Sequence, residues 1–267
     1  MTTTAVRRPH RLRALTTAEA RQFRRNKTLL YMGTVFPIAL PLFTFFVGRN
    51  ESGTSASLVA VTFEIFALTA LLFVQYYSVL SMVTTRRGEG VLKRLRTGEA
   101  RDWEIKTAPA VPGAVLTVLG AAVVAAAVYL GGAPGPVNIP LLAIAVGLGI
   151  IIFTLLALAT SAMTKNAEAA QITSLPVMAI AVLGMSSIRT VLPERWERIA
   201  DFTPFAAISD LTALGSVGRL FSTPKSEGAM TMAETFSAAA TPLVTLGVWA
   251  ALAYYLATRY FTWDDRG

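Results

Sequence analysis

The sequence contains no cysteine and only one histidine, His10, in 267 residues. These absences exclude disulfide bonds, thiol catalysis and Cys/His metal sites, so we expect no metal ion in this chain. The sequence also contains no GxxxxGK[ST] phosphate loop and no HExxH motif. We therefore expect no catalytic residues, no cofactor and no ATP site of this type in the chain itself.

Charged residues are scarce, at 15% of the sequence, against about 25% in a typical soluble domain. Hydrophobic residues make up 54%, and the mean hydropathy is +0.54. This composition indicates a protein whose natural solvent is lipid. A net charge of +8 can indicate a nucleic-acid partner. The basic residues lie mostly beside apolar stretches, however, so we expect contact with membrane lipid and no nucleic acid.

Stretches without charge locate the predicted membrane crossings, because each crossing takes about 20 mostly apolar residues. The longest stretch, 107–164, is predicted to hold two helices joined by the turn sequence GGAPGPVNIP. The predicted fold is all-α, a polytopic membrane protein with an N-terminal segment, 1–28, and a six-span domain, 29–267. The predicted transmembrane helices lie near 29–48, 58–84, 108–130, 140–163, 171–190 and 236–258.

The distribution of Lys and Arg predicts the orientation in the membrane. One set of connecting segments carries 18 of these residues, and the other set carries six. Because short cytoplasmic loops are enriched in Lys and Arg, the first set is predicted to be cytoplasmic. Both termini belong to that set.

The N-terminal segment is predicted to form an interfacial helix, with its apolar face in the headgroup region and its basic face toward anionic lipid. The residues of this helix are Leu12, Leu15, Phe23, Arg24 and Arg25. Glu19 falls inside the apolar arc and makes the amphipathic pattern imperfect. The alternative is a solvated basic tail that only sets the topology.

The loop 85–106 contains the sequence RRGEGVLKRLRTG. Its apolar side chains share one helical face, basic side chains occupy the rest, and Glu89 is spaced to pair with Lys93. A short amphipathic helix of this kind suits docking into a groove on a partner protein. The alternative is a basic loop that lies on lipid. The candidate docking residues are Glu89, Val91, Leu92, Arg94, Leu95 and Arg96.

Glu64 is the ionisable residue inside a predicted span. Charged side chains at such depth usually face a bundle interior or water, which makes Glu64 a candidate for the substrate path or a gate. The alternative, which the sequence favours, is a protonated or snorkelling side chain near the interface. The segment 190–235 is predicted to be external, with residues 205–221 as a re-entrant or interfacial helix rather than a seventh span.

The order of these features resembles the type-2 ABC exporter permease family, which includes antibiotic-resistance exporters of the daunorubicin type. The resemblance covers nearly the whole chain and is sharpest at RRGEGVLKRLRTG, which is similar to the family segment R-E-x-G-x-L-x-x-L. The chain departs from the family pattern at Arg87, where an acidic residue is frequent, and at Gly98 and Glu99, near which a proline is usual.

The resemblance implies a six-span permease with a cytoplasmic coupling helix and short external helices before the last span. It also implies a complex of two permease copies with two ABC ATPase subunits, which bind the ATP and Mg. Because the chain has no built-in second half, we expect a homodimer, in the plasma membrane of a bacterium. The expected substrate is an amphipathic drug, antibiotic, lipid or lipid-linked molecule. The competing hypotheses are a secondary transporter or channel that works alone and a membrane scaffold.

Overall fold

The computed structural model describes residues 11–25, 27–98, 100–223 and 228–264. Within these residues the secondary structure is helical and contains no strand. The predicted fold class, an all-α membrane protein, is confirmed. Part of the predicted N-terminal segment, residues 1–10, lies outside the described residues, as do residues 224–227 of the predicted external segment.

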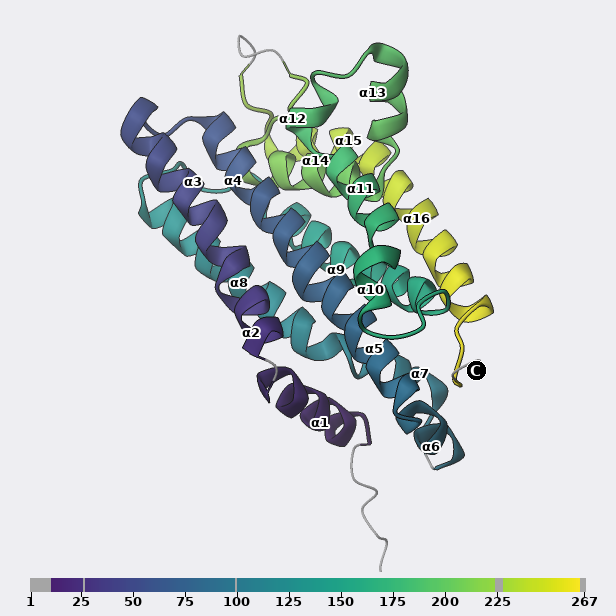
Figure 1. The fold of residues 1–267 in the computed structure, drawn as a ribbon. Coiled ribbons are helices and arrows are strands. Elements are labelled where there is room, and N and C mark those ends of the chain that lie inside the picture. The colour runs from purple at the N-terminus through teal and green to yellow at the C-terminus, as the bar shows by residue number, and fades with distance from the viewer. Residues whose placement is uncertain (1–10, 26, 99, 224–227, 265–267) are drawn as a thin grey trace, which may run out of the picture.

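The longest helix is formed by three consecutive elements and runs through the middle of the bundle (Figure 1). They are α4 (Ala56–Thr69), the π-helical segment η1 (Ala70–Tyr77) and α5 (Ser78–Gly88). Ser55 begins this helix by accepting a hydrogen bond from the backbone N–H of Leu58, as N-cap residues do. Most side chains of this helix are buried, among them Leu71, Tyr76 and Leu80. The helix therefore forms the core against which the others pack.

Four of the predicted spans coincide with helices that are long and apolar enough to cross a membrane. Besides the central helix, these are α8 (Ala110–Leu130), α9 (Ile139–Ser161) and α16 (Ala240–Arg259). Small residues allow close contact: a Cβ added to Gly113 of α8 would lie 2.7 Å from the carbonyl oxygen of Val74. Such small residues are typical of helix interfaces in membranes.

The other two predicted spans are not continuous helices. The first falls on α2 (Lys27–Thr34) and α3 (Phe36–Ser52), and the fifth falls on α10 (Ala169–Thr173), α11 (Leu175–Leu183) and α12 (Ser186–Arg189). Prolines follow two of the breaks, Pro37 after Val35 and Pro176 after Ser174. Proline lacks the N–H that would continue the preceding helix and clashes with the turn before it. The count of six spans therefore stays a prediction.

The segment predicted to be external contains α13 (Glu194–Asp201), α14 (Pro204–Val217) and α15 (Met232–Ala238). Of these, α14 is almost entirely buried and packs against α4, α9, α11 and α16. Its burial by four helices explains why its sequence is apolar although it is too short to span a bilayer. The position of residues 205–221 relative to the membrane, as a re-entrant or interfacial helix, stays a prediction.

The two ends of the bundle are occupied by different short helices (Figure 1). At one end, which we call the α6 end, lie α1 (Arg11–Arg25), α6 (Val91–Thr97), α7 (Asp102–Thr107) and the C-terminal tail, whose described residues are 260–264. At the opposite end, which we call the α13 end, lie α12, α13 and α15. The predicted docking loop and the predicted external segment are thus at opposite ends of the molecule.

Candidate functional site

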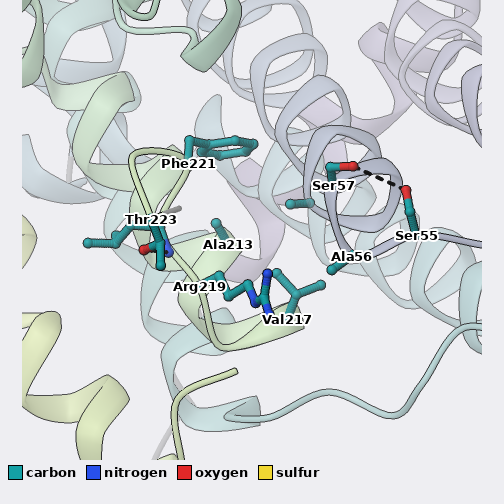
Figure 2. Close-up of a pocket in the computed structure, with 10 residues that line it drawn as sticks. Ser55, Ala56, Ser57, Ala213, Val217, Arg219, Phe221 and Thr223 are labelled. Carbon is teal, nitrogen blue, oxygen red and sulfur yellow. Dashed lines mark hydrogen bonds between the residues drawn. The ribbon is translucent and has the colours of Figure 1, made fainter. Parts of the chain in front are cut away.

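A pocket of about 330 Å³ lies between the start of α4, the end of α14 and the loop that follows α14 (Figure 2). Ser55 and Ser57 of α4 line it with hydroxyl groups, which lie 3.1 Å apart. Further lining residues come from α4, α14 and the loop after α14: Ala56, Ala60, Ala213, Val217, Arg219, Leu220, Phe221 and Thr223. The wall is mostly apolar with a few polar groups, which suits an amphipathic molecule in general rather than a specific one.

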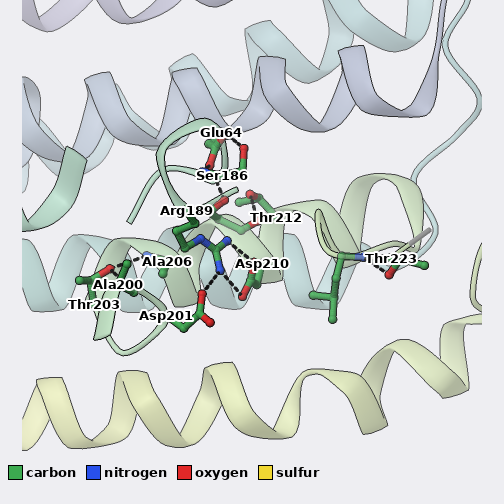
Figure 3. A network of polar contacts seen from close by, with 12 residues as sticks. Glu64, Ser186, Arg189, Ala200, Asp201, Thr203, Ala206, Asp210, Thr212 and Thr223 are labelled. Carbon is green, nitrogen blue, oxygen red and sulfur yellow. Dashed lines mark hydrogen bonds and ion pairs between the residues drawn. The ribbon is translucent and has the colours of Figure 1, made fainter. Parts of the chain in front are cut away.

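Glu64 lies deeper in the same end of the molecule, where α4 meets α12 and α14 (Figure 3). Its side chain is 1% exposed. Its Oε1 accepts hydrogen bonds from the backbone N–H of Ser186 and the hydroxyl of Ser209, both at 2.6 Å, and its Oε2 accepts one from the Ser186 hydroxyl at 2.6 Å. The interpretation of Glu64 as a snorkelling side chain is therefore wrong, because protein donors and not interfacial water satisfy the carboxylate.

Arg189, the last residue of α12, forms a second buried polar contact next to Ser186 (Figure 3). Its guanidinium lies 2.8 Å from Asp201 of α13 and 2.5 Å from Asp210 of α14. A buried cation of this kind is tolerated because it is paired and hydrogen-bonded. We call the six residues of these two contacts the Glu64 cluster: Glu64, Ser186, Arg189, Asp201, Ser209 and Asp210.

A second pocket, of about 260 Å³, opens directly onto the Glu64 cluster. Ser186, Arg189, Asp201 and Asp210 line one part of it, and apolar residues such as Phe221 line another. The cluster therefore links α4 of the central helix to the elements at the α13 end and faces a cavity. Within the described residues, no group of three or more His, Asp or Glu side chains is arranged to hold a metal ion.

At the α6 end, Arg86 and Arg87 in the last turn of α5 contact three separate parts of the chain. Arg86 lies 2.5 Å from Glu19 of α1. Arg87 donates hydrogen bonds to the carbonyl oxygens of Ser161, the last residue of α9, and of Thr164, which follows α9. It also donates one to the hydroxyl of Thr262 in the C-terminal tail. Glu19 thus falls inside the apolar arc of α1 because it is the residue that pairs α1 with α5.

The helix α1 carries its apolar face partly toward the protein, since it packs against α2, α7 and α8. Phe23 is buried, Leu12 and Leu15 are half-buried, and Arg24 and Arg25 are exposed. The structure thus brings the predicted apolar residues together on one side and the basic ones on the other. Placement of α1 in the headgroup region stays a prediction.

The predicted docking helix is present as α6, but its apolar face is turned inward. Leu92 is 1% exposed and belongs to the main buried cluster, which also includes Val83 and Ile105. Leu95 and Val91 are half-buried. Leu92 is therefore not free to enter a partner groove, because the chain's own core covers it. Docking through the partly exposed Val91 and Leu95 stays a prediction.

Charged side chains form the outer surface of α6 instead. Glu89, Lys93, Arg94 and Arg96 are exposed. The expected pairing of Lys93 with Glu89 is replaced by an ion pair with Asp264, at 3.6 Å. The surface that α6 offers to a partner is thus predominantly basic.

The sequence analysis missed five members of the Glu64 cluster and the contacts of the C-terminal tail. One signal was present: Asp210 is a single acidic residue within the apolar stretch 205–221. A buried carboxylate requires a partner, but the sequence does not indicate that the partner is Arg189. For the C-terminal tail, the sequence indicates only that it follows the last predicted span, not which residues it contacts.

Comparison with known proteins adds one finding to this geometry. A family model described as ABC-2 type transporter matches residues 10–213 of the chain. This match includes α1, the central helix, α6 and most of α14, and so covers the docking helix and the Glu64 cluster together. No curated protein matches the chain.

Proposed function

Because the chain belongs to the ABC-2 type transporter family, we propose that it is the membrane-spanning permease of an ATP-driven exporter. Members of this family are membrane components of transporters, and the family in general implies an ABC ATPase partner. The proposed substrate is an amphipathic drug, antibiotic, lipid or lipid-linked molecule, which leaves the cytoplasm or the inner leaflet. The mostly apolar lining of the pocket at the start of α4 supports this class of substrate.

The proposed complex contains two copies of this chain and two ATPase subunits, in the plasma membrane of a bacterium. ATP and Mg are bound by the ATPase subunits. One feature of the sequence supports the orientation. The Lys and Arg residues are concentrated in segments that include both termini, which are proposed to be cytoplasmic.

The exposed surface of α6 is the observation that carries this proposal. Lys93, Arg94 and Arg96 project from a short helix that is fixed to the bundle through buried Leu92 and through the arginines at the end of α5. A rigid basic surface of this kind suits a groove with acidic groups on an ATPase. Such charges set the orientation and the association rate of a complex.

The central helix provides a direct connection from α6 to the Glu64 cluster. Between Gly88 and Glu64 the chain is helical without a break, a length of roughly 35 Å at about 1.5 Å per residue. A displacement of α6 by the ATPase would therefore move α4 relative to α12 and α14. We propose that the Glu64 cluster is the gate that responds, with Glu64 facing the substrate path when the contacts to Ser186 and Ser209 open.

Charge reversal on α6 tests the docking surface. Lys93→Glu combined with Arg94→Glu places two negative charges against an acidic groove, which costs several kcal/mol, so we expect at least about a tenfold loss of ATPase association. The matched control is Arg195→Glu with Arg198→Glu, which reverses two exposed charges on α13 at the other end of the molecule.

Two measurements are compared for each variant. The first is the amount of ATPase that co-purifies with folded permease, and the second is the cellular accumulation of a fluorescent amphipathic drug. We expect both to change in the α6 variant and the ATPase association to persist in the α13 control. Full ATPase retention by the α6 variant would exclude α6 as the main docking surface. Absence of any ATPase from the wild-type preparation would instead favour a secondary transporter or a scaffold.

A further inference from the structure

The C-terminal tail that follows α16 packs its aromatic side chains on basic residues of α6 and α7. The ring of Phe261 lies 4.7 Å from the Lys106 ammonium, and the ring of Trp263 lies 5.4 Å from the same group. The guanidinium carbon of Arg96 lies 4.8 Å from the Trp263 ring centroid. The two rings also contact each other edge to face, with centroids 4.9 Å apart. The tail thus forms cation–π contacts with both short helices of the loop.

Polar contacts of Thr262 and Asp264 complete this packing. The hydroxyl of Thr262 accepts a hydrogen bond of 2.9 Å from Arg87, in the last turn of α5. Asp264 lies 3.6 Å from Lys93 on α6, but both side chains are more than half exposed, so this ion pair contributes little. The aromatic contacts and the bond from Arg87 are therefore the main attachment of the tail.

Glycines connect α6 to its neighbours along the chain. Gly90 joins α6 to α5 in the left-handed conformation, with φ +68°, and glycine restricts the backbone least. Gly98 ends α6 on the other side. A helix of seven residues between two glycines is not oriented by its backbone alone, so its side-chain contacts decide its orientation.

We propose that Phe261 and Trp263 are positioning residues that fix the orientation of α6 relative to α16. A displacement of α6 would then move α16 as well as the central helix and α8. This inference rests on the proposed role of α6 as the ATPase docking surface, but the positioning itself does not require an ATPase and can be measured on the permease alone.

Trp263→Ala removes two of the three cation–π contacts that join the tail to α6 and α7. We expect the ratio of docked to undocked tail to fall about 5- to 30-fold, which corresponds to about 1–2 kcal/mol for two contacts of this kind. Trp263→Phe keeps an aromatic face and is expected to retain most of the docking. Tyr260→Ala is the matched control, because the recorded ring contact of Tyr260 is to Arg259 beside it.

The absence of native cysteines makes the measurement direct, since introduced cysteines are the sole sites of thiol labelling. Nitroxide labels are placed at Thr97 on α6 and Tyr255 on α16, both exposed. The labelled permease is diluted with unlabelled permease in nanodiscs, and the distance distribution is measured by double electron–electron resonance on material that elutes as folded protein.

We expect a narrow distribution for the wild type, Trp263→Phe and Tyr260→Ala, and a broad one for Trp263→Ala. An unchanged distribution in Trp263→Ala, or equal broadening in Tyr260→Ala, would overturn the positioning role.

A second measurement, on the complex with its ATPase subunit, tests whether this positioning matters for coupling. We expect Trp263→Ala to retain the bound ATPase and to lose the permease-dependent part of ATP hydrolysis, with recovery in Trp263→Phe. Unchanged hydrolysis despite a broad distance distribution would refute the coupling role. Failure of any ATPase to bind the wild type would refute the proposed function and leave the positioning result standing.

Discussion

Buried acidic residues of this protein are stabilised by donors from distant parts of the chain. Glu64 accepts hydrogen bonds from Ser186 and Ser209, which lie 122 and 145 residues away in sequence. Glu19 pairs with Arg86, which in turn donates a hydrogen bond to the Gln22 side chain. Because a buried polar group without a partner is costly, each of these carboxylates fixes the relative position of two elements.

Substitution of Glu64 is expected to separate its structural from its functional contribution. Glu64→Ala leaves three buried donors without an acceptor, so we expect a loss of about 1–3 kcal/mol in the free energy of unfolding. Glu64→Gln keeps a carbonyl oxygen for Ser186 and Ser209 and should lose less, while transport changes. Thermal unfolding of the purified permease and drug accumulation in cells measure the two effects. Equal unfolding midpoints for Glu64→Ala and the wild type would contradict this account.

Protonation of Glu19 is expected to control the docking of α1. Burial raises the pKa of Glu19 from 4.5 to about 7, and the Arg86 guanidinium opposes this increase. A carboxyl group with a raised pKa stabilises the docked state fully below its undocked pKa, and that contribution is lost as the pH rises through about 7. We therefore expect the backbone amides of α1 to exchange hydrogen more slowly, after correction for intrinsic rates, at about pH 6 than at about pH 8. The variant Glu19→Gln should not show this difference, and a wild type without it would disprove the proposal.

At the scale of the element, α6 combines an inward apolar face with an outward basic face. Leu92 fixes the helix to the core, and the side chains of Lys93 and Arg94 are exposed. The tail adds a second attachment through Trp263. The helix is therefore a part of the bundle surface rather than a free hydrophobic peptide, and we expect its proposed docking to depend on charge more than on apolar burial.

The buried position of Leu92 gives a prediction about stability. Leu92→Ala creates a cavity in the core, which typically costs about 2–5 kcal/mol in the free energy of unfolding. We expect the yield of folded permease to fall, while the ATPase bound per folded molecule stays close to that of the wild type. Fluorescence-detected size-exclusion chromatography followed by subunit quantification measures both quantities. A normal yield together with loss of the ATPase would restore Leu92 as a docking residue.

At the scale of the whole molecule, the proposed coupling and gating sites lie at opposite ends of one helix bundle (Figure 1). The central helix joins them, with α6 after its last residue and Glu64 near its start. For a transporter driven by a cytoplasmic ATPase, this separation is useful because the motor and the exit gate must be on different sides of the membrane. The arrangement requires that α6 and α13 face opposite compartments.

Labelling of single introduced cysteines tests this topology. Thr97→Cys on α6 and Arg195→Cys on α13 are both at exposed positions. With a membrane-impermeant maleimide added to intact cells, we expect Arg195→Cys to react and Thr97→Cys to react only after the membrane is opened. Reaction of both positions from the same side would exclude the six-span topology and the assigned direction of the docking surface.

The sequence by itself determined the solvent of this protein and most of its helices. Hydropathy is a sum over neighbouring residues, so stretches such as 108–130 and 140–163 identify membrane helices without knowledge of any contact. The sequence alone also shows which chemistry is missing, because the absence of cysteine and of the GxxxxGK[ST] and HExxH motifs is established without knowledge of the structure. The motif RRGEGVLKRLRTG also located the helix α6 correctly.

Only the tertiary structure decided which faces are buried and which charges are paired. A helical wheel shows that Leu92 and Leu95 share a face but not whether a partner or the chain's own core covers it. Likewise, Glu64 appeared as a single charge in a span because its donors on α12 and α14 follow more than 120 residues later. The physical reason is that burial and hydrogen bonding depend on neighbours in space. For α6, Glu64 and the tail, those neighbours are brought together only by the packing of the whole bundle.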